Sequence, residues 1–473
     1  MATGMRSGRG LLAVMTVIVV CSGVVQGYLT PLLPEVGRHV GVGSVGQNNL
    51  YLLSQLAFAV MTPLLSRLGD LYGHRRLLRA SVAMVVAGSL LIAAWPTTAT
   101  LAVGMALQGA VVGFFPLLAG ILRSRAPELG RVGMSVLVGA LLVSIGAGGL
   151  VAGALSDRHA VLGLWTAVPV AALALTAALV LPDSSAPRGG AFNVRAATLL
   201  TLGLVALVLV LAQGGTWGWA SAASLVTAVL AVVLLGLWLL VERTSEQPLV
   251  DVRLLRNPRL AVVSAHTFCA AFGTIGFLGA NAVFLGSDPD ETGYGMGLGS
   301  QAIAVVSLAM VVVGCLGSTA TPRLAVRLGD RAVLGVSGLL GAAGFLCLGV
   351  LHDSLAQYLA GALVVGLATG VFESITRTLS AEVVPESETA LSVGVNELAL
   401  SLGAAIGAAV VGAVFAGHQS SGGHITLTGY GWAWGVCGGV ALLGALSALA
   451  FRPVPGARTR QPLKTPVHSG DLT

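Results

Sequence analysis

Fourteen apolar segments of roughly 18–25 residues divide this chain, and that pattern limits its possible folds more than any other feature. Segments of this length cross the roughly 30 Å hydrocarbon core of a bilayer as α-helices. Charged residues make up only 9% of the chain, whereas soluble domains carry about 25%. We therefore expect an all-α polytopic membrane protein. The predicted spans are approximately 10–29, 45–65, 77–95, 100–122, 132–154, 162–181, 196–213, 221–241, 260–285, 301–321, 332–350, 354–376, 390–416 and 431–451.

The positive charges predict how these spans are oriented. With the N-terminus inside, 23 of the 25 Lys and Arg residues fall on the cytoplasmic side, and only Arg38 and Arg158 fall outside. Cytoplasmic loops of membrane proteins carry such an excess, and a missed helix would scramble it. We expect both termini in the cytoplasm. The first segment lacks the cleavage site of a signal peptide, so we interpret it as an uncleaved helix.

The spans are arranged as six, two and six, and a short repeat indicates an internal duplication. Arg-Leu-Gly-Asp occurs at 67–70 and again at 327–330, each time after the second apolar segment of a group of six. Four identical residues are near chance, but their equivalent placement indicates a secondary transporter built from two helical bundles. The predicted domains are a first bundle at 1–182, a connector with two additional spans at 183–258, a second bundle at 259–452 and a cytoplasmic tail at 453–473.

Glycine pairs with a spacing of four residues occur in corresponding spans of the two groups. They predict close backbone approach between spans 4 and 5 and between spans 12 and 13. The alternative is chance, because 65 glycines generate such pairs freely. The pairs are Gly109/Gly113, Gly149/Gly153, Gly366/Gly370 and Gly403/Gly407.

The stretch between the second and third spans carries the most specific motif. Asp70, Gly73, Arg75 and Arg76 match the pattern Gly-x-x-x-Asp-Arg-x-Gly-Arg-Arg, although His74 replaces one Arg and two further positions also differ. The chain thereby resembles the major facilitator superfamily and, within it, the fourteen-helix drug:proton antiporters, over nearly its whole length. This resemblance implies the major facilitator fold and proton-driven export of lipophilic drugs or antibiotic-like metabolites by alternating access.

The resemblance also implies a conformational role for this stretch. Asp70 can pair with a neighbouring bundle helix or with a helix dipole, and the arginines hold the loop in the cytoplasm. Asp70, Gly73, Arg75 and Arg76 are therefore the predicted conformational latch. The alternative is that the arginines serve only to fix the topology.

Span 4 departs from the family pattern in a way that affects proton coupling. Gln108-Gly109 is present, but the Arg expected three residues earlier is Met105. In the family that Arg is linked to proton transfer, so we expect coupling in the second bundle instead.

Two carboxylates in the second bundle are the candidates for that coupling. A charged carboxylate near mid-membrane costs about 2.5–3.5 kcal/mol, so it is usually retained for function. Glu397 is the primary candidate, and Glu373, with Arg377 four residues later, is the second. The alternatives are an interfacial ion pair for Glu373 and, for Glu397, a packing carboxylate hydrogen-bonded to span 12.

The superfamily lines its substrate cavity with the first and fourth span of each bundle, which here implies spans 1, 4, 9 and 12. Sparse polar groups on an aromatic and aliphatic wall suit a lipophilic solute, including a cationic one, better than a sugar or a phosphate. A lone membrane histidine also serves often as a helix–helix hydrogen bonder. The predicted cavity residues are Gln26, Gln108, Phe115, His266 and Phe272.

Other classes of function have little support in the sequence. The five cysteines lack the spacing of a zinc site, and we expect neither a metal nor a cofactor. No segment combines charges and aromatics as a nucleic-acid-binding face does, and no P-loop is present, so an ion gradient would supply the energy. Gly-Val-Ser-Gly at 335–338 matches an intramembrane protease motif but has no suitably placed His, and we expect no enzyme.

The open alternative is a carrier for another small metabolite, working by uptake or uniport. The expected partners are a small-molecule substrate, a proton and the lipid bilayer. We expect a monomer that crosses the bacterial cytoplasmic membrane many times.

Overall fold

The chain folds into helices over the residues that its computed structural model describes, namely 2–126, 129–156, 161–182, 191–384, 389–420 and 423–452. Among these residues, 14 helices are long and apolar enough to span a membrane, and each corresponds to one predicted segment. The expected all-α polytopic architecture is therefore confirmed. Spans 2, 10 and 12 extend several residues beyond the prediction, because charged residues end the apolar pattern without ending the helix. Those spans end at Tyr72, Leu328 and Glu382.

The first six spans form one bundle. Its fourth span consists of three consecutive helices, its sixth begins with a 3-10 turn, and two short helices connect its first and second spans. The elements are α1 (Ala2–Gly27), η1 (Thr30–Leu32), α2 (Leu33–His39), α3 (Ser44–Tyr72), α4 (His74–Ala94), α5 (Thr98–Gln108), η2 (Gly109–Gly113), α6 (Phe114–Arg125), α7 (Gly130–Ser156), η4 (Leu162–Thr166) and α8 (Ala167–Val180).

The last six spans form a second bundle, whose first span is interrupted at 275–277. A short helix follows that span outside the bundle. The elements are η5 (Val252–Arg256), α11 (Pro258–Thr274), α12 (Leu278–Gly286), α13 (Pro289–Thr292), α14 (Ser300–Leu328), α15 (Asp330–Val350), α16 (Leu355–Glu382), α17 (Thr389–Ala416), α18 (Leu427–Ser447) and η7 (Ala448–Ala450).

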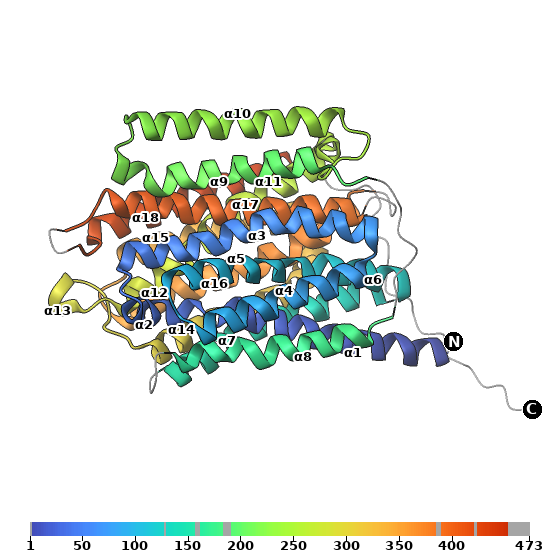
Figure 1. Cartoon of the computed structure of the whole chain (residues 1–473), viewed down its shortest axis with the longest axis horizontal. Helices are drawn as coiled ribbons and strands as arrows, with labels where there is room; N and C mark the ends of the chain where they lie inside the picture. Colours follow the sequence, from blue (N-terminus) through green and yellow to red (C-terminus); the bar gives the residue numbers. More distant parts are fainter. Residues whose placement is uncertain are drawn as a thin grey trace, which may run out of the picture.

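The two remaining spans, α9 (Val194–Trp217) and α10 (Ala222–Thr244), form a hairpin along one side of the molecule (Figure 1). α9 packs against α3 and α17, whereas α10 packs against α9 and η5. Only 11% of the apolar window of α10 is buried, so most of its side chains face outward. Along the chain, the hairpin lies between the two groups of six spans. The domain limits near 183 and 453 adjoin residues outside the described ranges and stay predictions.

Polar residues and glycines mark where the helices begin and end. The side chains of Thr97, Ser221 and Ser354 accept hydrogen bonds from backbone N–H groups three residues later, which caps α5, α10 and α16. Gly73 and Gly329 separate the second and third spans of each bundle and have φ of 98° and 88°. A side chain is strained at such positive φ, which accounts for glycine at both turns.

The two bundles meet along two seams, and each seam pairs the second span of one bundle with the fifth span of the other. α3, the second span of the first bundle, packs against α17, the fifth span of the second bundle. α7, the fifth span of the first bundle, packs against α14, the second span of the second bundle. This reciprocal pairing is what an internal duplication predicts.

The paired glycines do make close backbone contacts, but the predicted partner spans are wrong. Span 4 packs its glycines on span 2, and span 12 packs its glycines on span 10. In span 5, Gly149 meets span 1 but Gly153 meets α14 of the second bundle. Both glycines of span 13 meet span 9, so the two halves are equivalent only in part. The spacing identifies a smooth helix face and carries no information about which neighbour covers it. At each of these glycines, a Cβ would press against an atom of the neighbouring helix. The contacts are those of Gly109 with Ala57, Gly149 with Gly27, Gly370 with Gly314 and Gly407 with Phe272.

The repeated Arg-Leu-Gly-Asp does not occupy equivalent positions in the two halves. Asp70 lies in the last turn of α3, three residues before the turn glycine Gly73. Asp330 begins α15, directly after the turn glycine Gly329. The structural equivalent of Asp70 is therefore Val326, which is 83% exposed. The duplication is real, but this match is out of register by four residues.

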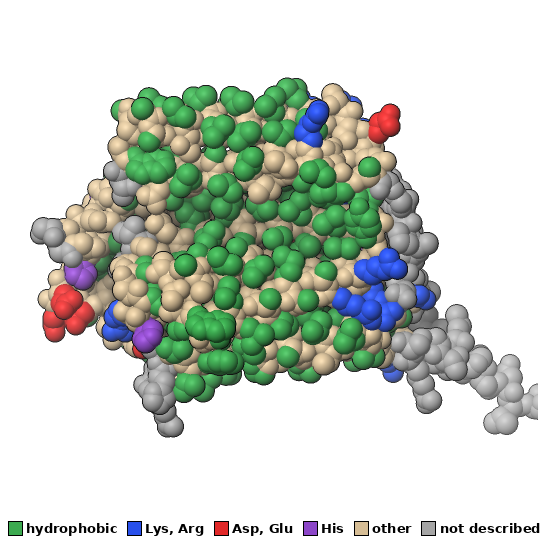
Figure 2. All heavy atoms as spheres, viewed as in Figure 1, with side chains coloured by type: hydrophobic (Ala, Val, Ile, Leu, Met, Phe, Trp, Pro, Cys, Tyr) green, Lys and Arg blue, Asp and Glu red, His purple; other side chains and the backbone are tan. Residues whose placement is uncertain are grey.

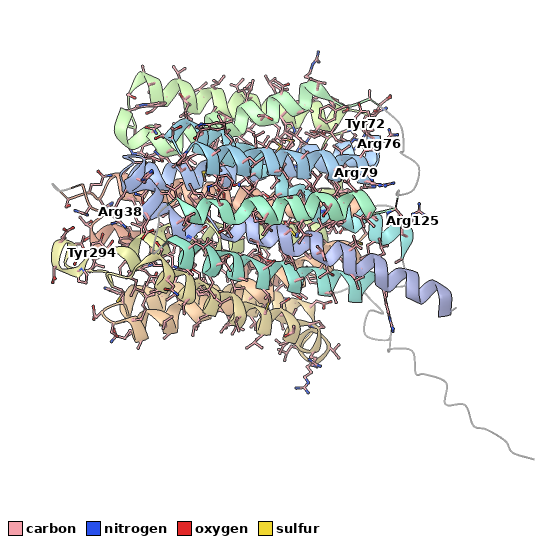
Figure 3. The ribbon with its side chains drawn as sticks, turned by 60° about the horizontal axis from the view of Figure 1, so that its bottom comes forward. Arg38, Tyr72, Arg76, Arg79, Arg125 and Tyr294 are labelled. Carbon is pink, nitrogen blue, oxygen red and sulfur yellow. The ribbon has the colours of Figure 1, made fainter. Side chains whose placement is uncertain are left out.

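The charged side chains are distributed unequally between the two ends of the helices. Arg76, Arg79 and Arg125 lie at one end, here named the inner end, and Arg38 and Tyr294 lie at the opposite, outer end (Figure 3). Apolar side chains cover the broad band between the two ends (Figure 2). Which end faces the cytoplasm stays a prediction, and Arg158 and the tail at 453–473 lie outside the described residues.

Candidate functional site

Glu373, Arg377 and Glu397 form a buried ion cluster between α16 and α17. Arg377 donates from Nη1 to Glu373 Oε2 and from Nε to Glu397 Oε1, both at 2.7 Å. A longer contact of 3.4 Å joins Arg377 Nη2 to Glu397 Oε2. The three side chains are only 9–11% exposed. One guanidinium therefore binds two carboxylates.

Helix geometry brings these groups together. Glu373 and Arg377 are four residues apart on α16, which places them on one face of the helix. α17 packs beside α16 and contributes Glu397. The ion pair of Glu373 with Arg377 is present but buried and not interfacial, and span 12 donates a hydrogen bond to Glu397. Arg377, which was counted with the cytoplasmic charges, is buried within a span.

The cluster also contacts the first bundle. The guanidinium carbon of Arg377 lies 5.4 Å from the centre of the Phe115 ring on α6, within the range of a cation–π interaction. Phe115, predicted to line a substrate cavity, is 8% exposed and borders the cluster instead. The cluster therefore spans the boundary between the bundles, where relative motion of the bundles would change its surroundings.

A small cavity lies in the first bundle between α1, α3 and the fourth span. Gln26 and Gln108, both predicted cavity residues, line it. Gln108 Nε2 donates to Tyr28 Oη and to Ser89 Oγ, both at 2.9 Å, which fixes its amide. Gln26 Nε2 donates to Ser22 Oγ at 2.9 Å.

Met105 lines the same cavity at the position where the family resemblance leads one to expect Arg. It is 2% exposed and lies one turn before Gln108 on the same helix. The cavity wall thus has a thioether where a guanidinium was expected, and its lining contains no Asp, Glu, Lys, Arg or His.

Two predicted cavity residues lie elsewhere, inside the second bundle. His266 is fully buried, and its ring nitrogens lie 2.9 Å from Gly444 O on α18 and 2.9 Å from Ser337 Oγ on α15. It joins three helices, which is the alternative role considered for it. Phe272 is 5% exposed and packs its backbone against Gly407 of α17. Neither residue lines the cavity between α1, α3 and the fourth span.

The predicted latch residues lie at the inner ends of α3 and α4, beside the end of α8. Asp70 Oδ1 lies 3.2 Å from His74 Nε2, and the two side chains are 11% and 17% exposed. This contact joins Asp70 to the start of the next helix within the same bundle. Arg75 donates to Leu179 O at 3.2 Å and caps the end of α8. Arg76 is exposed at the inner surface (Figure 3).

Several residues at these sites were not predicted from the sequence. Arg79 donates to Leu179 O at 2.7 Å and to Ala178 O at 3.2 Å, so it assists Arg75 in capping α8. Tyr51 and Gln55 of α3 line the cavity beside Gln26. The sequence does carry a pattern that could have identified them. Polar and aromatic residues recur at the spacing of one helix face, at Tyr51, Ser54, Gln55 and Phe58. Among the described residues, no group of three or more His, Cys, Asp or Glu side chains could hold a metal ion.

The sequence profile of the Major Facilitator Superfamily matches residues 15–318 and 263–470. An uncharacterized MFS-type transporter of Mycobacterium tuberculosis is 27% identical over 420 residues, which are 85% of this chain and 58% of that protein. The chain therefore spans little more than half the length of that relative.

The multidrug resistance protein Stp of the same organism is 28% identical over 404 residues, which are 82% of this chain and 72% of Stp. Among solved structures, the human organic anion transporter MFSD10 has a TM-score of 0.66 at 17% identity, covering 93% of this chain and 99% of that one, which is a likeness of fold. The fourteen apolar helices and the bacterial relatives indicate a multi-pass protein of the bacterial cell membrane. The chain belongs to the Major Facilitator Superfamily.

Proposed function

We propose that the protein exports lipophilic drugs or antibiotic-like metabolites by alternating access, in exchange for protons. The observation that carries this proposal is the cluster of Glu373, Arg377 and Glu397 at the boundary between the bundles. Export is supported by the relative Stp, which is named a multidrug resistance protein. The cytoplasmic placement of both termini and the monomeric state belong to the same proposal.

The charge balance of the cluster suits the binding of one proton. Two ionised carboxylates and one guanidinium leave one uncompensated negative charge in a buried site. Such a charge is costly where water is excluded, and one proton on either carboxylate makes the cluster neutral. Contact with water from one side would favour release of that proton. Movement of Phe115 away from Arg377 is one way in which the bundles would change that exposure.

Substrate and proton sites are close enough to influence one another. Val111 lines the cavity, and Phe115 contacts the cluster four residues later, about 6 Å along the helix axis. On the α3–α17 seam, Thr62 Oγ1 and Ser401 Oγ lie 3.3 Å apart. Thr62 lies one turn from the cavity residue Phe58, and Ser401 lies one turn from Glu397. A shift of α17 that follows protonation therefore reaches the cavity helix directly.

The test is accumulation of fluorescent lipophilic compounds in everted membrane vesicles from an efflux-deficient bacterium. Vesicles that contain the protein should accumulate at least one compound when respiration acidifies their interior, and a protonophore should abolish the accumulation. Glu397→Gln should abolish uphill accumulation but retain exchange of internal for external substrate. Glu373→Gln should have a smaller effect, because Arg377 keeps its pairing with Glu397. Glu246→Gln, an exposed carboxylate of the connector, is the matched control.

Two results would contradict the proposal. Uphill accumulation with normal pH dependence in both Gln variants would place the proton site outside the cluster. Transport without pH dependence in the unaltered protein would indicate a uniporter, which is the alternative carrier considered above.

A further inference from the structure

The cavity beside α3 is built from uncharged polar groups on an aromatic and aliphatic wall. Tyr51, Ser54, Gln55 and Phe58 lie at the first, fourth, fifth and eighth positions of one helix face and all line it. Gln26, Thr30 and Gln108 complete its polar part. Only part of a drug-sized molecule fits in this conformation, so the cavity is a subsite that contacts one edge of a ligand.

Gln55 distinguishes this cavity from an ordinary packing defect. The residue is 6% exposed, and its carboxamide makes no hydrogen bond among the described residues. Its amide atoms are not among the enclosed polar atoms that lack a partner, so they are reachable from the cavity that Gln55 lines. Gln108 differs, because Tyr28 and Ser89 occupy its amide. An amide that lines a cavity and has no protein partner is available to a ligand.

The chemistry of the lining defines the class of ligand. A carboxamide donates from its nitrogen and accepts at its oxygen, which matches neighbouring carbonyl and hydroxyl groups. The rings of Tyr51 and Phe58 and the thioether of Met105 supply surface for a flat apolar ring. A cationic ligand would find no carboxylate in this lining, because all of its residues are uncharged.

We infer that Gln55 determines substrate specificity in this subsite by hydrogen-bonding the carbonyl or hydroxyl edge of uncharged aromatic substrates. The inference rests on the proposed export function and narrows its substrate class, since lipophilic cations are excluded as preferred ligands of the subsite. The Glu373–Arg377–Glu397 cluster has no part in this recognition and serves the proton.

The test is equilibrium binding to the purified protein in lipid nanodiscs, without any ion gradient. The probes are an uncharged hydroxyanthraquinone and the cation tetraphenylphosphonium. The unaltered protein should bind the hydroxyanthraquinone more tightly. Gln55→Leu should weaken that binding about tenfold, the loss expected for one hydrogen bond between uncharged groups. Gln55→Glu should weaken it as well and should strengthen binding of the cation.

Gln47→Leu is the matched control. Gln47 lies on the same helix and is 7% exposed, but it does not line the cavity and its amide donates to Val42 O at 3.0 Å. This variant should bind both probes as the unaltered protein does. Gln55→Asn retains the amide on a shorter side chain and should bind the hydroxyanthraquinone more tightly than Gln55→Leu, which separates loss of the amide from misfolding.

Two outcomes would overturn the inference: tighter binding of the cation by the unaltered protein, or unchanged binding of the hydroxyanthraquinone by Gln55→Leu. Failure of the proposed function is a separate result. A protein that binds the hydroxyanthraquinone through Gln55 but does not accumulate any compound in energised vesicles would disprove proton-driven export and leave the specificity assignment intact.

Discussion

The phenolic oxygen of Tyr51 lies 2.8 Å from the backbone carbonyl oxygen of Ile275, so one hydrogen bond joins α3 to the interruption between α11 and α12. The Ile275 carbonyl also accepts from Leu278 N at 3.1 Å, and its second lone pair is available to Tyr51. Gly279 packs against the Tyr51 ring, where a Cβ would lie 3.0 Å from the nearest ring carbon. These contacts join the two bundles in the outer half of their boundary.

Tyr51→Phe should therefore favour opening of the outer end. Loss of one hydrogen bond of about 1 kcal/mol shifts the equilibrium between access states about fivefold. A cysteine introduced at Ser54 should react correspondingly faster with an impermeant thiol reagent added outside. Tyr358→Phe is the control, because Tyr358 bonds to Asn281 within the second bundle. Equal labelling rates with and without Tyr51→Phe would show that this bond does not hold the outer end closed.

Arg377→Met should destabilise the protein strongly. The change leaves Glu373 and Glu397 buried without a cation, and removal of one partner of a buried ion pair typically costs about 3–5 kcal/mol. The measurement is thermal unfolding in detergent. Adding Glu373→Gln and Glu397→Gln to Arg377→Met should restore most of the stability, because no uncompensated charge then remains. A triple variant no more stable than Arg377→Met would mean that the loss arises from packing and not from charge.

Asp70→Asn should leave the protein folded and inserted but slow its turnover about fivefold, the effect of losing a contact worth about 1 kcal/mol. The lost contact is the one with His74. His74→Gln should have the same effect, and the double variant should be no slower than either single variant. Asp353→Asn, whose side chain is 83% exposed, is the control. Turnover at the normal rate in Asp70→Asn would mean that the predicted latch has no conformational role and that its arginines serve only to fix the topology.

Gly370→Ala should weaken the packing of α16 on α14. A Cβ at Gly370 would overlap the carbonyl of Gly314, and overpacking of this kind costs about 1–3 kcal/mol. Gly349→Ala is the matched control, because a Cβ there meets no atom within 4 Å. The loss should appear as a lower midpoint of thermal unfolding for Gly370→Ala alone. Identical midpoints would indicate that the two helices can separate at little cost.

Labelling of introduced cysteines tests the orientation in the membrane. Asp290 lies on α13, and Arg256 lies on η5 before α11; both are exposed. A cysteine at Asp290 should react with an impermeant thiol reagent added to intact cells, and one at Arg256 should react only after the membrane is broken. The unaltered protein, whose own five cysteines are buried or partly buried, measures the background. Reaction of a cysteine at position 256 in intact cells would contradict the predicted orientation.

The sequence predicted the spans well because each needs a continuous apolar segment, and the chain carries few charges to confuse the pattern. It predicted contacts poorly. Glycine spacing identified the close-packing faces of spans 4, 5, 12 and 13 but not their partners, since four-residue periodicity is a property of one helix alone. Glu397 and Arg377 lie 20 residues apart on different helices, so their pairing depends on how α16 and α17 pack. Gln55 was missed because one uncharged residue in an apolar span carries no signal until its neighbours are known.

The hairpin of α9 and α10 makes the two seams between the bundles unequal toward the bilayer. α9 packs against both α3 and α17, so it lies over that seam and α10 lies beyond it (Figure 1). The described parts of α7 and α14 have no comparable packing with either helix of the hairpin. A solute that diffuses within the lipid would therefore meet the two helices of the hairpin at the α3–α17 seam. At the α7–α14 seam it would meet the two bundles themselves. The two seams are therefore not equivalent toward the surrounding lipid, because the hairpin covers the α3–α17 seam and leaves the α7–α14 seam uncovered among the described residues.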